Sequence, residues 1–231
     1  MAAGQVSQEI ADEAAGVVVG ILGGTGDQGR GLARRLAMAG NRVIIGSRDA
    51  GRAVSSAASV GSPPSVAGAA NEQAARAADL VIVAVPWEGH GDLLARLAGP
   101  LEGKIVVDCV NPLAFGAHGA YPVPVPEGSA AQQAAAVLGR STVVGAFHHV
   151  PASLLLDPGV VSLDMDVLVL GDDRHATDLV QALAGRIPGA RGVYAGRLRN
   201  CGQVEALTAN LVSVNRRYKA HAGLRITGIG P

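Results

Sequence analysis

Short continuous apolar runs alternate with longer amphipathic stretches over the first half of the chain. The runs have the length of buried strands, and the stretches repeat at the helical period. The runs fall at residues 17–22, 42–45, 80–85 and 104–109, and the stretches at residues 28–39, 49–58, 71–78 and 92–97. Strands that alternate with helices in this way predict an α/β protein with a Rossmann-type, doubly wound parallel sheet.

The second half of the chain repeats this pattern less regularly. It begins with a loop rich in proline and glycine at residues 112–128, and Gly-Ser-Pro-Pro at residues 61–64 predicts a shorter loop. The elements expected after residue 128 are helices at 129–138 and 173–184 and strands at 142–147 and 167–170. From residue 203 apolar residues recur at spacings of three and four, which predicts a helix with one apolar face made by Val204, Leu207, Leu211, Val214 and Tyr218.

Three parts of the chain follow from these patterns. Residues 1–15 carry no Lys or Arg and no sustained apolar run, so they do not resemble a secretory signal, and we expect a flexible N-terminal extension. Residues 16–147 are expected to form the Rossmann domain, and residues 148–231 a smaller C-terminal α/β lobe.

Composition and charge narrow the function classes. Hydrophobic residues make up 48% of the 231 residues, and the formal net charge is zero, so no overall field attracts nucleic acid or an anionic membrane. No apolar run approaches the roughly 18 residues that span a bilayer. Cys109 and Cys201 lie far apart without CxxC spacing, which predicts neither a metal site nor a disulfide framework. A reducing cytoplasm is the simplest location.

Residues 24–29 form a G-x-G-x-x-G motif that follows a predicted strand and opens a predicted helix, the context that dinucleotide binding requires. The glycines permit a tight turn and a close approach of the backbone to a pyrophosphate, and the helix N-terminus offers free N–H groups. A turn without a ligand is the alternative. The expected cofactor residues here are Gly24, Thr25, Gly26, Asp27, Gln28 and Gly29.

The end of the second strand indicates which dinucleotide binds. NAD enzymes place Asp or Glu there for the ribose 2′-hydroxyl, whereas this chain has Ser47 and Arg48. A hydroxyl and a guanidinium suit the 2′-phosphate of NADP, and Arg52 follows on the next helix, where Asp49 is expected to be the capping residue. These residues favour NADP over NAD, with a solvated surface as the alternative.

Four segments together resemble the F420-dependent NADP oxidoreductase family. They are Gly-Gly-Thr-Gly-Asp-Gln-Gly at residues 23–29, Gly-Ser-Arg at 46–48, Val-Pro-Trp-Glu at 85–88 and Phe-His-His-Val-Pro-Ala at 147–152. Many dehydrogenases share the glycine motif, and the last two segments are more specific. The chain departs from the family pattern at His149, where a hydroxyl residue is expected, and in its N-terminal extension.

The resemblance implies a homodimer that transfers a hydride between NADP(H) and the deazaflavin coenzyme F420. It implies that Val85, Pro86 and Ala152 lie beside the nicotinamide, and that His148, Val150 and Pro151 border the deazaflavin. The C-terminal lobe would complete this pocket and supply the dimer contacts. Because the tail of F420 is strongly anionic, Arg216 and Arg217, together with Lys219 and Arg225, are expected to bind it. A solvated basic helix end is the alternative.

The residues are consistent with hydride transfer, which needs two flat rings held face to face and no nucleophile. His148 is the candidate catalytic residue, because an imidazole can stabilise charge that develops on the acceptor ring. A core histidine is the alternative for His148, and a packing role is favoured for Trp87.

Three alternatives to this interpretation stay open. One is an NADPH-dependent reductase of an imine, ketone or ferric chelate, with His148 or Tyr218 as a donor to the substrate. Another is an NADP-sensing protein without turnover. The third concerns assembly, since the apolar face of the last helix is either a dimer contact or buried within its own chain.

Overall fold

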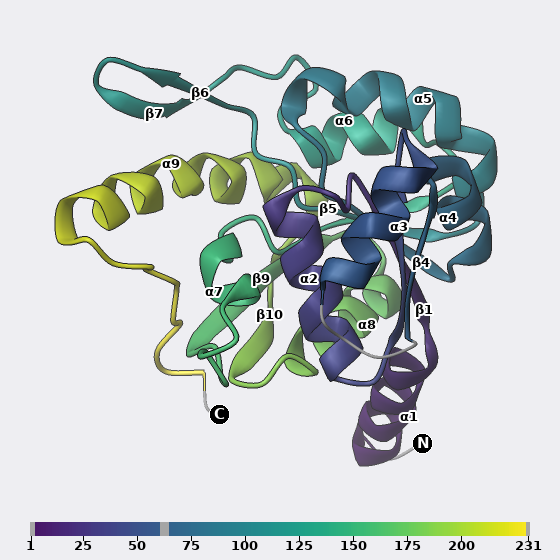
Figure 1. The fold of residues 1–231 in the computed structure, drawn as a ribbon. Coiled ribbons are helices and arrows are strands. Elements are labelled where there is room, and N and C mark those ends of the chain that lie inside the picture. The colour runs from purple at the N-terminus through teal and green to yellow at the C-terminus, as the bar shows by residue number, and fades with distance from the viewer. Residues whose placement is uncertain (1–2, 61–64, 230–231) are drawn as a thin grey trace.

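A single eight-stranded sheet organises the computed structural model, which describes residues 3–60 and 65–229 (Figure 1). The strand order is β10-β9-β8-β5-β4-β1-β2-β3, and every neighbouring pair is parallel except β8 and β9. The strands are β1 (Val18–Leu22), β2 (Arg42–Ser47), β3 (Val66–Ala70), β4 (Leu80–Val83), β5 (Ile105–Asp108), β8 (Thr142–Gly145), β9 (Met165–Gly171) and β10 (Ala190–Gly196). The predicted α/β class and doubly wound parallel sheet are confirmed.

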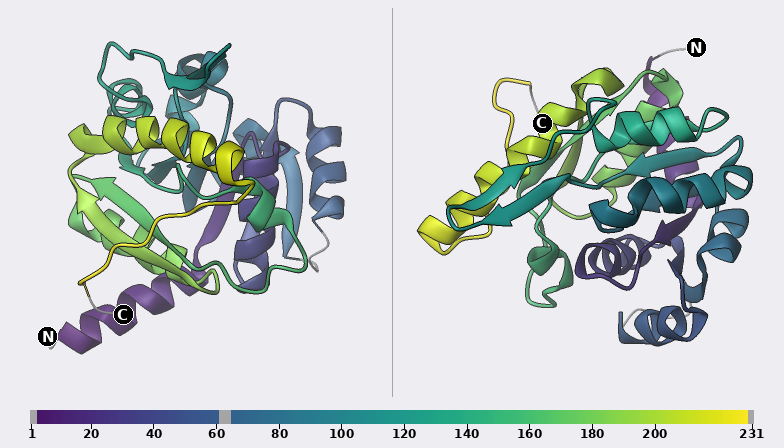
Figure 2. Two further views of the ribbon diagram at one scale, coloured as in Figure 1. Left: turned by 90° about the vertical axis from the view of Figure 1, so that its left-hand side faces the viewer. Right: turned by 90° about the horizontal axis from the view of Figure 1, so that it is seen from above.

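Helices cover both faces of the sheet and bury two separate hydrophobic cores (Figure 2). One face carries α1 (Ala3–Gly16), α2 (Asp27–Met38), α3 (Ala50–Ser59), α7 (Ala152–Leu156) and α8 (Arg174–Gly185). The other carries α4 (Asn71–Ala77), α5 (His90–Leu101), α6 (Ala130–Val137) and α9 (Cys201–Tyr218), with the single turns η1 (Trp87–Gly89) and η2 (Leu198–Asn200). Connections leave β1 and β4 toward opposite edges of the sheet, so a crevice opens outside the carboxyl ends of these two strands.

The sequence missed two strands that contain glycine. β3 and β10 each have a glycine in the interior, which weakens a strand signal. The same glycines permit close packing of helices on the sheet, since a Cβ on Gly68 would lie 2.3 Å from the backbone of α3, and one on Gly192 would lie 2.4 Å from the backbone of α8. The glycines that weaken the sequence signal of these two strands are therefore required for helix packing.

The proline-rich segment after β5 contains a hairpin rather than a plain loop. Strands β6 (Leu113–Gly116) and β7 (Gly119–Pro122) pair antiparallel, and β7 packs against α9. The hairpin and α9 extend together from one side of the body (Figure 1). The short loop predicted at residues 61–64 lies outside the described residues.

The N-terminal segment is helical, which corrects the expectation of a flexible extension. Helix α1 packs against α8, Ala14 is fully buried, and the carbonyl of Ala14 accepts a hydrogen bond from Asn41 Nδ2 at 2.8 Å. Alanine-rich sequence has high helix propensity even without a strong apolar stripe, which explains the helix. None of the described helices is both long and apolar enough to cross a membrane.

The strands after residue 148 continue the main sheet rather than forming one of their own. β9 pairs antiparallel with β8, and β10 then pairs parallel with β9 at the edge. The division of the chain into two parts at residues 147 and 148 therefore stays a prediction, and the polypeptide on either side of it shares one sheet.

Candidate functional site

A cleft of about 850 Å³ lies outside the carboxyl ends of β1, β2 and β4. Nine of the predicted cofactor residues line it, namely Thr25, Gly26, Asp27, Gln28, Ser47, Arg48, Arg52, Val85 and Pro86. Gly24 and Gly29 lie beneath it, where a Cβ on Gly29 would be 2.5 Å from the Cα of Gly24. These two glycines allow the N-terminus of α2 to approach the turn after β1.

The N-terminus of α2 is open toward this cleft. The helix begins at Asp27 with Gly26 as its N-cap residue, and no side chain caps it. The first N–H groups of a helix have no partners within the helix, so an uncapped N-terminus in a cleft can accept an anion. Asp27, which would oppose an anion, has its carboxylate 2.7 Å from Arg30 Nη2.

Two of the arginines that line the cleft lie at the end of β2 and the start of α3. Arg48 and Arg52 are both exposed, and within the described residues neither forms an ion pair. Asp49 caps α3 as expected, with Oδ1 accepting from the backbone N–H of Arg52 at 3.0 Å, and the hydroxyl oxygen of Ser47 accepts from the backbone N–H of Asp49 at 3.2 Å. The acid beside the two arginines is thus engaged by backbone groups, and the guanidinium groups are free for a phosphate.

A second cavity of about 520 Å³ adjoins the cleft at the end of β4. Both cavities are lined by Gln28, Ala84, Val85, Pro86 and Glu88. The second one also receives His148, Val150, Pro151 and Ala152 from the segment after β8, and residues 208–215 from α9. The structure therefore brings together the two sequence blocks that are 60 residues apart and were expected to border the reacting rings. We refer to this second cavity as the reaction pocket.

The backbone at His148 is held from three elements. Its carbonyl oxygen accepts hydrogen bonds from Asn111 Nδ2 at 2.7 Å and from Thr208 Oγ1 at 3.2 Å, and Gln28 Nε2 donates to the carbonyl of Phe147 at 3.3 Å. Phe147 has a φ of 63°, an unfavourable conformation for this residue type. A strained turn that three side chains hold in place is typical of a site whose geometry matters.

The imidazole of His148 is neutral at neutral pH. It is 4% exposed, and burial lowers its pKa to about 4. Neither ring nitrogen has a hydrogen-bond partner within the described part of the chain. His148 can therefore offer one N–H donor and one acceptor, but no positive charge.

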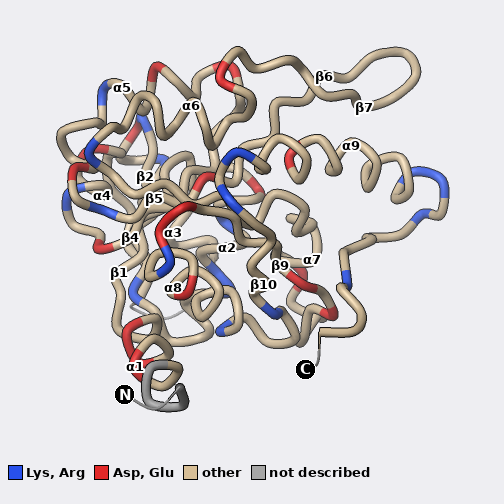
Figure 3. Tube along the Cα trace, turned by 180° about the vertical axis from the view of Figure 1, so that it is seen from behind, with Lys and Arg blue, Asp and Glu red and all other residues tan. Residues whose placement is uncertain are grey.

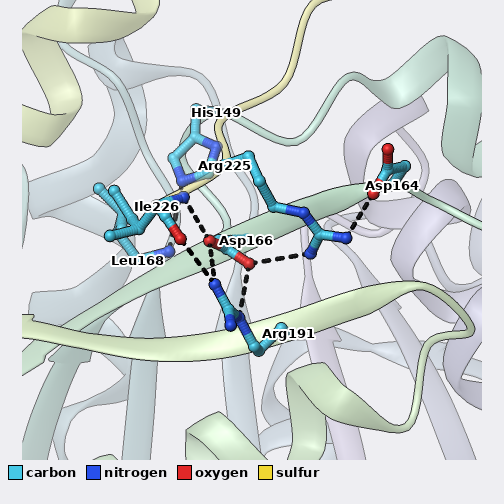
Figure 4. A network of polar contacts seen from close by, with 7 residues as sticks. All are labelled: His149, Asp164, Asp166, Leu168, Arg191, Arg225 and Ile226. Carbon is cyan, nitrogen blue, oxygen red and sulfur yellow. Dashed lines mark hydrogen bonds and ion pairs between the residues drawn. The ribbon is translucent and has the colours of Figure 1, made fainter. Parts of the chain in front are cut away.

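His149 is also a buried, neutral residue of the pocket wall. Its Nε2 accepts from the backbone N–H of Leu168 at 3.3 Å, and burial, followed by the neighbouring His148, lowers its pKa to about 4. Acceptance at Nε2 places the proton on Nδ1. Figure 4 shows the ring beside Leu168 of β9, the strand next to the β10 edge of the sheet.

A buried polar cluster behind the reaction pocket was missed by sequence reasoning. His90 and Asp108 are fully buried, with Nε2 and Oδ2 2.6 Å apart. Glu205 on α9 is 2% exposed and accepts from the backbone N–H groups of Ala130 and Ala131 at 2.9 and 3.2 Å. Burial raises the pKa of Glu205 to about 7. The available signal was an acid that ends an otherwise apolar strand.

The basic residues at the C-terminal end divide into two groups. Arg216 and Arg217 are exposed in the last turn of α9, and Figure 3 shows basic positions gathered at this end of the helix. They follow directly after Asn215, which lines the reaction pocket. Arg225, by contrast, forms ion pairs with Asp164 and with buried Asp166. The expectation that Arg225 joins the cationic patch is therefore wrong.

Asp166 is the centre of the network that holds Arg225 (Figure 4). Arg191 donates to both of its oxygens at 2.9 and 2.8 Å, and the backbone N–H of Ile226 donates at 2.6 Å. The hydrogen bonds from Arg191 are the main reason that the pKa of Asp166 lies far below its usual range. This network fixes the segment after α9 across the beginning of β9.

Comparisons with known proteins all find the same kind of reductase. Residues 18–112 match the family described as NADP oxidoreductase, coenzyme F420-dependent. The F420-dependent NADP reductases of Methanothermobacter marburgensis and Methanocaldococcus jannaschii are each 39% identical over 222 residues, which cover 91% of this chain and 98% of each relative. A 1.70 Å crystal structure of a candidate F420-dependent NADP reductase from Arthrobacter sp. FB24 has 28% identity and a TM-score of 0.78, with 91% of this chain and 99% of that chain covered.

Proposed function

The chain belongs to the family of F420-dependent NADP oxidoreductases, and from this premise we propose that its two adjoining cavities bind NADP(H) and coenzyme F420 for hydride transfer. One observation carries the proposal. The cleft of about 850 Å³, which we call the nucleotide cleft, shares a wall with the reaction pocket at Val85 and Pro86. Two rings, one bound in each cavity, would therefore meet at the end of β4. Face-to-face placement of two rings is the principal requirement of the reaction.

The residues present fit NADP(H) at its two anionic groups. The uncapped N-terminus of α2 would hold the pyrophosphate, and Ser47, Arg48 and Arg52 would hold the 2′-phosphate. When bound, the nicotinamide supplies or accepts the hydride. The protein contributes binding, orientation and exclusion of water through the walls at Val85, Pro86 and Ala152.

The neutral imidazole of His148 is the proposed catalytic group. It borders the reaction pocket, and Asn111 and Thr208 hold its backbone. A neutral ring can donate a hydrogen bond to the acceptor as charge develops there, without repelling or protonating the reactants at neutral pH. Val150 and Pro151 line the same wall as apolar contacts. Arg216 and Arg217 are proposed to bind the anionic tail of F420 beside the pocket.

The other two candidate activities have less support than hydride transfer between NADP(H) and F420. A reductase of an imine, ketone or ferric chelate was expected to use His148 or Tyr218 as a donor, and Tyr218 is 74% exposed at the end of α9. A sensor without turnover needs no second cavity beside the nucleotide cleft. The structure and the relatives both support the enzyme that uses two coenzymes.

The deciding experiment follows the absorbance of oxidised F420 with NADPH or NADH as the reductant. We expect turnover with NADPH, and a kcat/KM for NADH that is lower by about tenfold or more because NADH lacks the phosphate that the arginines contact. Tight NADPH binding without any F420 reduction, in either direction of the reaction, would contradict the proposal.

We also propose that the chain forms a homodimer through the hairpin and the end of α9. These elements carry the exposed apolar side chains Phe115, Tyr121, Val214 and Tyr218, and β7 packs against α9. Exposed apolar side chains on adjoining elements favour association. Light scattering at micromolar concentration should report a dimer that Tyr121→Asp weakens and that Val161→Asp, an exposed apolar position on another loop, leaves intact. A monomeric wild type would contradict this proposal.

A further inference from the structure

His90 is a fully buried histidine whose two ring nitrogens both face oxygen acceptors. Nε2 lies 2.6 Å from Asp108 Oδ2, and Nδ1 lies 3.0 Å from Gln133 Oε1. The other end of the Gln133 amide, Nε2, donates to Glu127 Oε2 at 3.4 Å, which turns Oε1 toward His90. An oxygen acceptor at each ring nitrogen favours a proton on both, which is the imidazolium form.

The surroundings of His90 stabilise that charge. Burial by itself lowers the pKa of His90, but the hydrogen bond and the charge of Asp108 together with Gln133 and Glu205 outweigh it, and the pKa lies above its ordinary value. The ring of Trp87 is centred 5.6 Å away at an angle of 33°, within the range of a cation–π contact. The residue is thus one half of a buried ion pair with Asp108.

This ion pair connects two walls of the reaction pocket. On one side, Asp108 Oδ1 accepts from the backbone N–H of Val110 at 3.0 Å, and the backbone of residues 109–111 lines the pocket. Asn111 then holds the carbonyl of His148. On the other side, His90 contacts Trp87, which directly follows Pro86 at the junction of the two cavities. His90 itself does not line the pocket.

We propose that His90 is a positioning residue for hydride transfer: as an imidazolium paired with Asp108, it holds the segment after β5 and the turn at Trp87 in the arrangement that brings the two rings together. The proposal rests on the function proposed above. It assigns a role in catalysis to a side chain that touches neither coenzyme.

A pH dependence follows from the pair. As the pH rises through the pKa of His90, the ring loses a proton and the Asp108 carboxylate is left without its counter-ion. The titratable groups around the pair are Glu205 and Cys201 from α9, and Cys109 and His148 from the pocket wall. Glu127 is reached through Gln133 ahead of α6. Burial raises the pKa of Glu205 to about 7, and its ionised carboxylate favours the imidazolium of His90 further.

His90→Gln and Asp108→Asn test the proposal, with His175→Gln on the exposed surface of α8 as the matched control. Displacing a pocket wall should lower kcat/KM for F420 by about 10–100-fold. The dissociation constant for NADPH should stay within about threefold, because the phosphate contacts are distant from the pair. The wild type should lose F420 activity at alkaline pH, and His90→Gln should lose that pH dependence.

Direct observation of the ring keeps the proposal testable if the variants do not fold. In wild-type protein labelled with ¹⁵N at histidine, His90 should show two protonated ring nitrogens at neutral pH. A neutral His90 ring would overturn the proposal, and so would folded His90→Gln with an F420 kcat/KM equal to that of the control. If the wild type reduces no F420, the proposed function fails, whereas the ring measurement still decides whether the ion pair exists.

Discussion

The nucleotide cleft and the reaction pocket adjoin each other but are built in opposite ways. The cleft is formed mainly by the turns after the neighbouring strands β1, β2 and β4, and its charged groups Arg48 and Arg52 are exposed at the end of β2 and the start of α3. The pocket is assembled mainly from four distant segments, and the charges near it, His90 and Asp108, are fully buried in a pair. The difference separates two tasks: exposed charge selects a ligand, and buried charge fixes geometry.

The two arrangements respond differently to change. Interactions between charges exposed to water extend over about one Debye length and weaken as salt is added. The loss of one such charge changes the affinity for the ligand that it contacts. A buried charge whose partner is removed destabilises the fold, because no solvent replaces the partner. Substitutions in the cleft should therefore weaken the binding of one ligand more than that of another. Substitutions behind the pocket should change the free energy of unfolding and the catalytic rate together.

The largest effect on ligand binding that would sharpen this comparison is expected at Arg48 in the cleft. Arg48→Ala should weaken NADPH by about 10–100-fold, since a charged hydrogen bond to phosphate contributes about 1.5–3 kcal/mol. NADH should be nearly unaffected. Fluorescence titration with both cofactors measures this, and Arg42→Ala at the other end of β2 is the control. Equal losses for NADPH and NADH would remove Arg48 from the 2′-phosphate site.

A pH-dependent effect on stability is expected at Glu205 behind the pocket. Its pKa is raised to about 7 in the folded state, so the folded protein binds a proton that the unfolded chain releases at lower pH. Stability should therefore fall as the pH rises from about 4.5 to 7 through this group. Glu205→Gln should remove that part of the decline, which is on the order of 3 kcal/mol for a pKa raised from 4.5 to about 7.

The measurement for Glu205 is urea unfolding of wild type and variant at pH 5 and pH 8. The difference between the two proteins isolates Glu205 from the histidines that titrate over the same range. Glu102→Gln, at an exposed position, should show no such difference. A pH-independent gap between wild type and Glu205→Gln would show that the carboxyl group is ionised throughout, and the contrast between cleft and pocket would weaken.

The smallest effect is expected at the basic end of α9. Replacing both Arg216 and Arg217 with Ala should raise the KM for F420 by only a few-fold, because exposed charge pairs contribute roughly 0–1 kcal/mol each. The salt dependence of that KM should flatten, and NADPH binding should stay unchanged. Arg199→Ala, exposed near the start of the same helix, is the control. A double variant with the wild-type KM at low and high salt would exclude a role in binding the tail.

The cleft could be anticipated from sequence because its determinants are local. The glycine turn, Ser47 with Arg48 and the cap at Asp49 each lie within a few residues of the element they complete. The main strands and helices were also predicted from local periodicity. The exceptions include α1, α7, the hairpin of β6 and β7, and the strands β3 and β10, whose interior glycines lower strand propensity while permitting helix contact.

The polar groups behind the pocket could not be anticipated, because pairing between distant residues leaves no periodic signal. His90 and Asp108 are 18 residues apart and meet only after β4 and β5 align. Arg225 looked free for an anionic ligand because Asp166 precedes it by 59 residues. The formal net charge of the chain predicts neither ion pair, because it does not tell which side chains lie close together.

The network around Asp166 has a consequence for the order in which the chain is made. β9 leaves the ribosome well before the residues that neutralise its Asp166. Arg191 follows Asp166 by 25 positions, and Arg225 follows it by 59. Until both have emerged, the growing chain would bury a lone carboxylate by completing this edge of the sheet. The nucleotide-binding half can fold during synthesis. The pocket wall around His149 and β9 should become fixed only when the residues beyond α9 have left the ribosome.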